Sequence, residues 1–535
     1  MAGSYTPLEY CVQFGESDLN FVRRLMEKFG LYYFFIHTEA GHCLVVTDSK
    51  EAHRPVPEYA TVPYVPTQSG GQVRDTECID TLSVRSRVKN HQFFSADYNF
   101  LTPAKVVSGK AQGAPGFSAP PPKEHFAYPG GFQESTNGEL LTRVGYEVAV
   151  CQKTIYTGGG NARGISAGYT VTPTHHDVPA FAHKLLVIAS SHRISESAAE
   201  AGGSGSGYHG SFTAIPAATQ FRTERGTACP RVRGVQTAKV VGPQGEEIHT
   251  DEYGRVRVHF FWDRHVEKQE AASCWIRVAY PSAGSGWGFQ SIPRIGQEVV
   301  VDFEEGDPDR PLVIGTVHNA EQLPPYVLPG RKTVSGIKTR SSKTGGSSDF
   351  NEIRFDDKQG NEYLYLQAQK DWWRLVKNDA YSQINRHRHS LVKGNALETI
   401  EGMCDVVVKG DASARTEGAR SEVVQDDWHC LTQGQYGLEA ASDLSLKAGA
   451  QVSAQAGSSV ELLAGSTVNV SAGQSIKLSA GACSITIGPA GIVMSGPAVS
   501  VSGGQGGSAS PKAPGAPAAA GISVIPPDPI QGEHR

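Results

Sequence analysis

Few places in this 535-residue sequence combine residue types at a spacing that could support chemistry. His387 and His389 in "NRHRHSL" are two residues apart, so a β-strand would point both imidazoles to one face, where they could begin a metal site. No Cys, Asp or third His lies at ligand spacing, which favours a solvated basic strand. The adjacent His175 and His176 would point to opposite faces, so a shared metal is not expected.

A second candidate is the acidic stretch "DFEEGDPDRP", whose carboxylates could suggest acid catalysis or calcium binding. Their spacing is not that of a calcium loop. A Gly-Asp-Pro turn with Arg310 nearby explains them as turn formers and surface ion pairs. The carboxylates are Asp302, Glu304, Glu305, Asp307 and Asp309.

Two further candidate binding sites consist of glycines and of tryptophans. Gly284, Gly286 and Gly288 resemble a phosphate-binding loop, but no helix start and no Lys-Ser/Thr pair follows them, which favours a barrel loop. Trp372 and Trp373 could form a sugar platform, although packing where a shaft begins is the simpler reading. Neither a G-x-S-x-G nor an H-E-x-x-H motif is present. We therefore expect no catalytic residue, no cofactor and no metal.

Composition limits the possible partners and the compartment. The formal charge is −5 with mixed signs throughout, which gives no footprint for nucleic acid or anionic lipid. Nine scattered cysteines form no C-x-x-C pair and indicate free, mostly buried thiols from a reducing compartment. The start "MAGSYTPLEY" has no signal-peptide pattern, and no long apolar run follows. We expect a protein that folds in the cytosol and leaves it, if at all, without a cleaved signal.

The elements that must position these residues are mainly β. Residues 1–213 alternate short strands with Pro- and Gly-rich turns around one strong amphipathic helix, Glu16 to Gly30. Residues 214–330 hold several short strands, which predict a small barrel of the oligonucleotide/oligosaccharide-binding (OB) type. In "DEYGRVRVHFFWD", alternation places Val256, Val258 and Phe260 on one face of a strand and Arg255, Arg257 and His259 on the other.

An eight-residue repeat occupies the C-terminal part of residues 331–503. From Ser442 to Pro497 the units read SDLSLKAG, AQVSAQAG, SSVELLAG, STVNVSAG, QSIKLSAG, ACSITIGP and AGIVMSGP. Apolar residues at positions three and five share a strand face with the small residue at position seven, and glycine makes the corner. The predicted buried residues are Leu444, Leu446, Val460, Leu462, Val468, Val470, Ile476, Leu478, Ile485 and Ile487.

Units this short predict an assembly of three chains. A single-chain prism with such small inward residues would enclose little apolar volume. Three identical chains wound together, each supplying every third strand of a face, would close the interior symmetrically. The sequence therefore predicts a trimeric, interwound β-helix.

Four stretches carry a resemblance to a known family: "ESDLNFVRRLMEKFGLYYFFIH", "DEYGRVRVHFFWDR", "WIRVAYPSAGSGWGFQSIPRIGQEVVVDFEEGDPDRPLVIGTVHN" and "NEIRFDDKQGNEYLYLQAQKD". They resemble the valine-glycine repeat protein G (VgrG) family, the spike of the type VI secretion system, which is related to phage tail hubs and needles. The resemblance implies a homotrimer on a tube of Hcp rings, a PAAR-repeat tip protein, effector or adaptor partners, and mechanical passage through target membranes. It also implies assembly in the cytoplasm and translocation without a signal peptide.

Two differences from the family concern the ends of the chain. Family members usually begin with a further portion that completes the base, so residues 1–213 correspond to a partial hub. The segment 504–535 is a Gly/Ala/Pro-rich tail, too short for an enzymatic extension, and could be a docking segment or a disordered end. Its candidate docking residues are Ile522, Val524, Ile525 and Ile530.

Two other functions stay open. A polysaccharide-processing enzyme on a single-chain β-helix needs longer coils and carboxylates grouped on one face, and the repeat shows neither. A spike of a phage or an extracellular contractile particle would share the architecture, and the sequence separates it poorly from the type VI spike. The favoured hypothesis is a spike that is not an enzyme.

Overall fold

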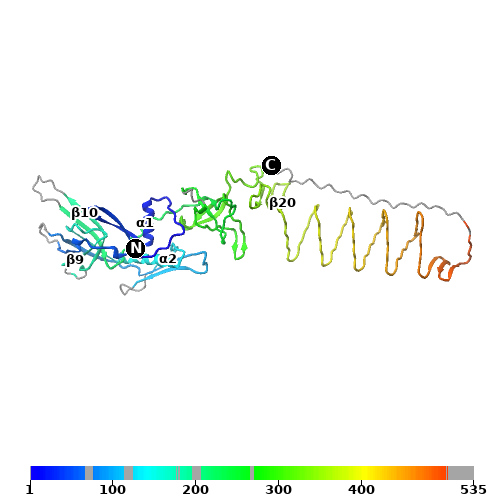
Figure 1. Cartoon of the computed structure of the whole chain (residues 1–535), viewed down its shortest axis with the longest axis horizontal. Helices are drawn as coiled ribbons and strands as arrows, with labels where there is room; N and C mark the ends of the chain where they lie inside the picture. Colours follow the sequence, from blue (N-terminus) through cyan, green and yellow to red (C-terminus); the bar gives the residue numbers. More distant parts are fainter. Residues whose placement is uncertain are drawn as a thin grey trace. The chain divides into compact units, whose positions relative to one another are not determined.

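The computed structural model describes residues 2–66, 76–113, 124–175, 178, 181–195, 207–264, 270–501 and 503. It divides into two compact units, Met1–Arg374 and Leu375–Arg535. Figure 1 colours the chain from blue through green and yellow to red. Strands dominate the described residues, with only two α-helices among them, so the predicted mainly β class is confirmed.

Helix α1 (Asp18–Phe29) confirms the helix predicted near the N-terminus. The Ser17 side chain accepts a hydrogen bond from the Asn20 N–H, and Gly30 ends the helix with φ of 77°, a left-handed conformation that glycine adopts without strain. The helix does not bury a purely apolar face, because its most buried residues are Arg24 and Glu27. The aromatic strand β1 (Tyr32–Thr38) follows and pairs antiparallel with β2 (Gly41–Thr47).

A six-stranded sheet forms the centre of the base. Its hydrogen-bonded order is β3-β9-β10-β11-β8-β4, and a core around Ile79 and Leu185 covers one face. The strands are β3 (Thr61–Pro63), β4 (Ile79–Ser86), β8 (Thr154–Gly160), β9 (Thr170–Thr174), β10 (Leu185–Ser195) and β11 (Gly207–Pro216). Strand β11 continues past residue 213, where the sequence predicted the base to end.

The second helix of the described chain, α2 (Ser135–Cys151), lies against a three-stranded sheet. That sheet has the order β6-β5-β7, with β5 (Gln92–Asp97), β6 (Val107–Gln112) and β7 (Glu124–Ala127). The sequence pattern did not predict α2. The two helices and two larger sheets give the base a mixed but β-rich character.

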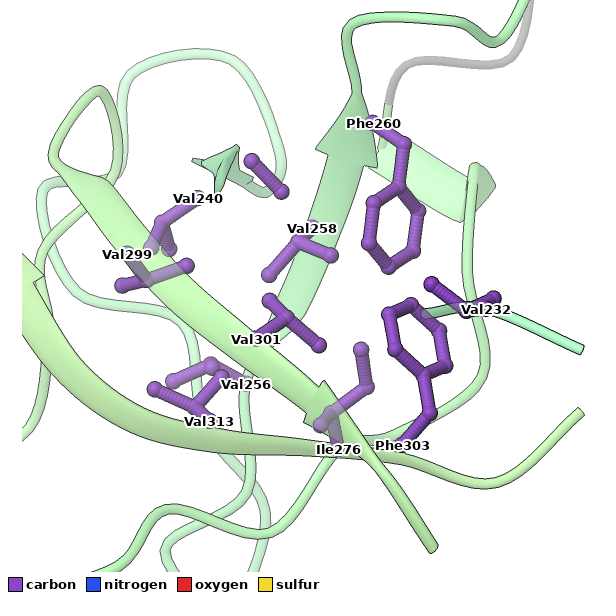
Figure 2. Packing of buried hydrophobic residues seen from close by; sticks show 11 residues of the cluster. Val232, Val240, Val256, Val258, Phe260, Ile276, Val299, Val301, Phe303 and Val313 are labelled. Atoms are coloured by element: carbon purple, nitrogen blue, oxygen red, sulfur yellow. The ribbon is translucent and has the colours of Figure 1, made fainter. Parts of the chain in front are cut away.

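The barrel has a single apolar core, which Figure 2 shows from close by. Its sheet order is β13-β12-β16-β17, and isolated bridges from Val256 to Ile276 and from Val278 to Val313 join the remaining segments. The strands are β12 (Gln236–Val241), β13 (Arg257–Phe260), β16 (Glu298–Phe303) and β17 (Pro311–Val317). Val256, Val258 and Phe260, which the alternation placed on one face, are all buried. The stretch "CWIRVAY" contributes bridges rather than a full strand.

A second antiparallel sheet, here called the neck sheet, follows the barrel. It contains β18 (Val334–Lys338), β19 (Glu352–Asp356) and β20 (Tyr363–Gln367) in that order. Ile337, Ile353 and Leu366 are cross-strand neighbours and are all exposed. One face of the neck sheet is therefore apolar and uncovered in a single chain.

The last three predicted repeat units do not wind like the others. They form a small antiparallel sheet, the tip sheet, with β21 (Ile476–Ala480), β22 (Cys483–Gly488) and β23 (Gly491–Ser495). Gly481 and Gly491 have φ of 55° and 115° at the two reversals, which glycine allows. The prediction that winding octads continue to Pro497 is therefore wrong. Within the described residues, no helix is both long and apolar enough to span a membrane.

Candidate functional site

The candidate site is the repeat stretch of residues 371–475, here called the shaft. Backbone bends fall at residues 369–370 and 377–378 and then at every eighth residue to 473–474, with six extended residues between bends. Figure 1 shows this stretch, in yellow and orange, as a series of open turns. The eight-residue periodicity predicted from the later units thus begins earlier in the chain.

The turns of the shaft make no contact through their backbones. Within residues 371–475, all of which the structure describes, no strand ladder and no backbone-to-backbone hydrogen bond is formed. Extended backbone exposes one N–H donor and one C=O acceptor per residue, and these groups need partners wherever they are buried. The shaft therefore presents open strand edges along its whole length.

Side chains alternate between two faces of each shaft strand. We number the six residues between bends one to six and call positions two, four and six the even face and the others the odd face. In one strand Tyr381 on the odd face is 89% exposed and Ile384 on the even face 50%. In a later strand the values are 97% for Leu397 and 49% for Ile400. The even face is the more enclosed one in these strands.

Position six carries an aliphatic or small residue in every shaft strand. The sequence at this position, from Val376 to Ala472, is Val, Ile, Val, Ile, Val, Thr, Val, Thr and then five alanines. A column of this kind suits a strip that must pack against the same position of neighbouring strands. The change from branched residues to alanine is accompanied by larger apolar residues at positions two and four, such as Leu444 and Leu446.

The predicted buried residues divide between the shaft and the tip sheet. Six of them occupy positions two and four on the even face and are more than half exposed in a single chain: Leu444, Leu446, Val460, Leu462, Val468 and Val470. The other four lie in the tip sheet, where Ile476 pairs with Ile487 and Leu478 with Ile485. Their burial between copies stays a prediction.

A charged contact that the sequence did not predict joins the base to the barrel. Arg310 donates two hydrogen bonds to Asp97, at 3.1 Å and 2.6 Å, across 213 residues of sequence. The Asp97 side chain is 1% exposed and also accepts bonds from the N–H groups of Tyr98, Gly131 and Phe132. Burial acts to raise the pKa of Asp97, but Arg310 and the backbone donors outweigh it and hold the pKa below its usual value.

The other carboxylates of the acidic turn have structural partners as well. Asp309 accepts a hydrogen bond from the Val12 N–H at 2.7 Å, and burial raises its pKa. Glu304 pairs with Arg277 at 2.7 Å. Glu304 thus forms a surface ion pair as predicted, whereas Arg310 pairs with the buried Asp97 outside the turn, which was not predicted.

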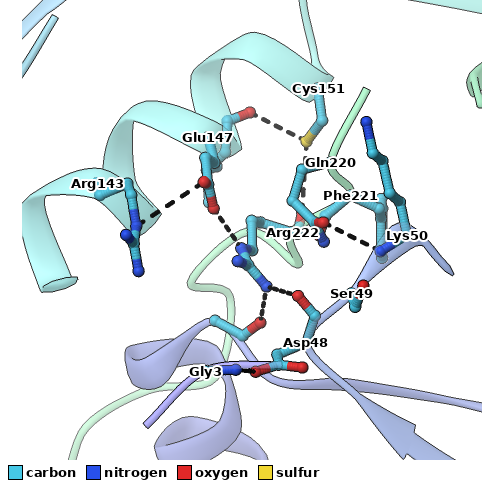
Figure 3. A network of polar contacts seen from close by, with 12 residues as sticks. Gly3, Asp48, Ser49, Lys50, Arg143, Glu147, Cys151, Gln220, Phe221 and Arg222 are labelled. Atoms are coloured by element: carbon cyan, nitrogen blue, oxygen red, sulfur yellow. Dashed lines mark hydrogen bonds and ion pairs between the residues drawn. The ribbon is translucent and has the colours of Figure 1, made fainter. Parts of the chain in front are cut away.

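A second polar network holds α2 against the N-terminal segments, as Figure 3 shows. The Arg222 guanidinium is 9% exposed, donates to Glu147 at 2.6 Å, and donates to the carbonyl oxygens of Gly30 and Asp48. The Cys151 thiol donates to the Arg222 carbonyl. This network fixes α2 against the N-terminal segments.

Within the same region, Asp48 is a carboxylate saturated with donors. It accepts hydrogen bonds from the N–H groups of Ala2 and Gly3 and from the Tyr5 hydroxyl, at 2.6 to 2.8 Å. Burial acts to raise the pKa of Asp48, but these donors outweigh it and lower the pKa to about 2. The carboxylate is a structural anchor that stays charged at neutral pH.

The remaining chemical candidates do not come together into a site. The rings of His387 and His389 are 6.3 Å apart and exposed, and the described residues contain no group of three His, Cys, Asp or Glu side chains suited to a metal. His175 is described, whereas His176 lies outside the described residues. Gly284 and Gly288 belong to a short hairpin, β14 (Ala283–Gly284) with β15 (Trp287–Gly288).

Most of the tryptophan and cysteine side chains singled out in the sequence are not buried in a single chain. Trp372 and Trp373 are exposed in the single chain. Only Cys78 and Cys151 of the nine free cysteines are buried, so the expectation of mostly buried thiols is wrong for a single chain. The docking residues predicted in the tail lie outside the described residues: Ile522, Val524, Ile525 and Ile530.

Three family models match successive parts of the chain. Residues 1–198 match the phage tail baseplate hub (GPD) model. Residues 238–318 match the type VI secretion system/phage-baseplate injector OB domain, which confirms the predicted barrel type. Residues 335–448 match the bacteriophage T4 gp5 C-terminal trimerisation domain, which includes the neck sheet and most of the shaft.

Curated relatives cover most of the chain. The type VI secretion system spike protein VgrG1a of Pseudomonas aeruginosa is 43% identical over 379 residues, 70% of this chain and 58% of the relative. The actin cross-linking toxin VgrG1 of Vibrio cholerae is 37% identical over 384 residues, 71% of this chain and 34% of the toxin. The matched part of this chain thus covers little more than half of VgrG1a and about a third of the toxin.

A solved structure also matches part of the chain. It is the E. coli c3393 protein, a type VI secretion component described as similar to the T4 tail proteins gp27 and gp5, with 20% identity and a TM-score of 0.37. The match covers 57% of this chain and 62% of that one.

Proposed function

Because this chain belongs to the VgrG (valine-glycine repeat protein G) family of type VI secretion spike proteins, we propose that three copies of it form a non-enzymatic spike. The base is mounted on a tube of Hcp rings. Contraction of a sheath drives the spike through the membrane of a target cell. The protein is assembled in the cytoplasm and leaves the cell through the secretion system.

One observation supports this proposal most strongly: within residues 371–475 the shaft forms no backbone-to-backbone hydrogen bond, and its large apolar side chains are exposed in a single chain. A single-chain β-helix of an enzyme would stack its own coils through parallel strand ladders, and the described shaft has none. Other copies can supply both the backbone partners and the cover for the apolar side chains, since strands of two neighbours fit between successive turns of one chain. The match of residues 335–448 to a trimerisation domain supports three copies.

In the trimer the even face points toward the threefold axis. Its apolar residues then bury one another, together with the corresponding face of the tip sheet, and each fully buried Val or Leu contributes on the order of 1.5–3 kcal/mol. The exposed apolar face of the neck sheet offers a further surface for contacts between copies. The proposed trimer core is Leu444, Leu446, Val460, Leu462, Val468, Val470, Ile476, Leu478, Ile485 and Ile487.

The partners beyond the trimer follow from family membership. A PAAR-repeat tip protein caps the far end of the shaft, and effector or adaptor proteins attach near it, with the tail residues Ile522 to Ile530 as one docking segment. The relative named as an actin cross-linking toxin is much longer than the stretch it shares with this chain. We therefore assign the shared part to the spike and not to an enzymatic activity.

Binding to the tube and the tip tests the function directly. Purified protein is mixed with Hcp hexamers and a PAAR-repeat protein, and co-sedimentation is measured for the full chain and for a chain ending at Gly503. The full chain is expected to bind both, and loss of the tail to reduce capture of tip or effector proteins without affecting Hcp. Glycan cleavage by a monomer would instead support the polysaccharide-processing alternative.

A further inference from the structure

The even face of the shaft is apolar in its later strands, but in its earlier strands the same face carries charged residues. Five of its even-face positions are charged: Arg374, Arg388, Glu398, Arg420 and Glu422. All lie in the first half, and from Val424 to Ala472 the even face carries no charge. If the even face is interior, as in the proposed function, these charges are enclosed, and four of the five, Arg388, Glu398, Arg420 and Glu422, can offset the cost by pairing with one another.

Arg420 and Glu422 already form a pair within one strand. The Arg420 Nη2 lies 3.2 Å from the Glu422 Oε2, with both side chains on the even face. One unit earlier the same two positions hold Ala412 and Ala414. Alanines leave room beside this pair for the long charged side chains.

Interwinding places successive units of different chains next to one another. Each unit carries a chain to the next face of the prism, so the strands above and below any unit belong to the other two copies. Neighbouring strands on a face are about 4.8 Å apart. Arg388 at position two of its unit therefore lies diagonally across from Glu398, at position four of the next unit, in another chain. The three copies together form three Arg388–Glu398 pairs between chains at one level of the shaft. At the level of Arg420, three arginines and three Glu422 side chains form a ring of six charges.

A uniform repeat leaves the alignment of the chains undetermined. Because every unit has eight residues, one chain can slide by a whole unit along its path and return its backbone to equivalent positions. Sliding would bring Arg420 and Glu422 to the level of Trp428 and Cys430 of the other chains, where bulky or apolar groups replace their charged partners. The apolar half of the shaft offers weaker discrimination, since many of its units carry similar Val and Leu residues.

We propose that the even-face charges, above all the ring of Arg420 and Glu422, fix the axial register of the three chains. The interface that they define is specific for a second and third copy of this same chain in the same alignment. A buried polar group that selects one alignment at some cost in stability is a known device in coiled coils. This inference rests on the proposed trimer and adds the reason why only one alignment forms.

The test compares three full-length proteins: the wild type, the double variant R420A/E422A and the charge-swapped control R420E/E422R. A ketone-reactive spin label is placed on p-acetylphenylalanine at the outward position of Ser445, which avoids the nine native cysteines. Pulsed dipolar spectroscopy then measures the distances between labels. The wild type and the swapped control are expected to give one narrow distance, because both keep opposite charges in the ring.

The alanine variant is expected to give a broadened distribution or a second distance, because its unit then resembles the preceding one, with Ala412 and Ala414. A single unchanged distance in this variant would overturn the register proposal. Light scattering on the unlabelled wild type separates this result from failure of the proposed function. A monomeric wild type rejects the trimer itself, whereas a trimeric wild type with an unaffected alanine variant rejects only the role of the charges.

Discussion

Replacing Arg310 by methionine should weaken the joint between base and barrel. The substitution keeps the side-chain volume but removes both hydrogen bonds to Asp97, whose side chain is 1% exposed. Removing one partner of a buried ion pair costs about 3–5 kcal/mol. Three backbone N–H groups still donate to Asp97, so we expect the lower end of that range, about 3 kcal/mol.

Urea denaturation followed by tryptophan fluorescence measures this change, with Arg277→Met as the matched control. Arg277 also pairs with a carboxylate, Glu304, but the two side chains are 38% and 41% exposed. Exposed pairs contribute about 0–1 kcal/mol, so the control should unfold close to the wild-type midpoint. If Arg310→Met unfolds together with the control, the buried pair does not hold the joint and the reasoning is refuted.

Three further predictions concern the shaft and the base. Val470→Asp should prevent trimer formation in light scattering, because it puts three charges near the axis at a cost of several kcal/mol, whereas Ser471→Asp on the odd face should assemble normally. Arg222→Met should lower the melting temperature of the base, since it removes the donor to the carbonyl oxygens of Gly30 and Asp48 and to Glu147, and each buried acceptor left unpaired costs about 1–3 kcal/mol. Asp48 has a folded pKa of about 2 against 3.8 unfolded, so its stabilisation of about 2 kcal/mol is present above pH 3.8 and is lost as the pH falls toward 2. Acid unfolding of Asp48→Asn should lack this component, and an unchanged acid transition would contradict the assignment.

Local patterns predicted much of the fold. The helix ending at Gly30 and the inward side of Val256, Val258 and Phe260 follow from capping and alternation within one short segment. The repeat likewise predicted regular bends, because each unit carries its own corner residue. These features depend only on residues close together in the sequence, and they can therefore be predicted from it.

Features that depend on distant residues could not be predicted in the same way. The pair of Arg310 and Asp97 joins segments 213 residues apart, and nothing in either segment indicates the other. The tip sheet is a different case, because its units have the same apolar spacing as the winding ones. Only the conformation of the glycines at its reversals, Gly481 and Gly491, distinguishes a hairpin from a wound corner.

The mass of the assembled protein in solution tests the central claim most directly. One chain has a mass of 57.2 kDa, and multi-angle light scattering should give three times that value across a range of concentrations. Hydrogen exchange on the same sample should show protected amides throughout residues 371–475, although one chain supplies them with no backbone partner. A 57.2 kDa particle whose shaft amides are equally protected would contradict the account, because a single chain would then supply the hydrogen-bond partners of its own shaft.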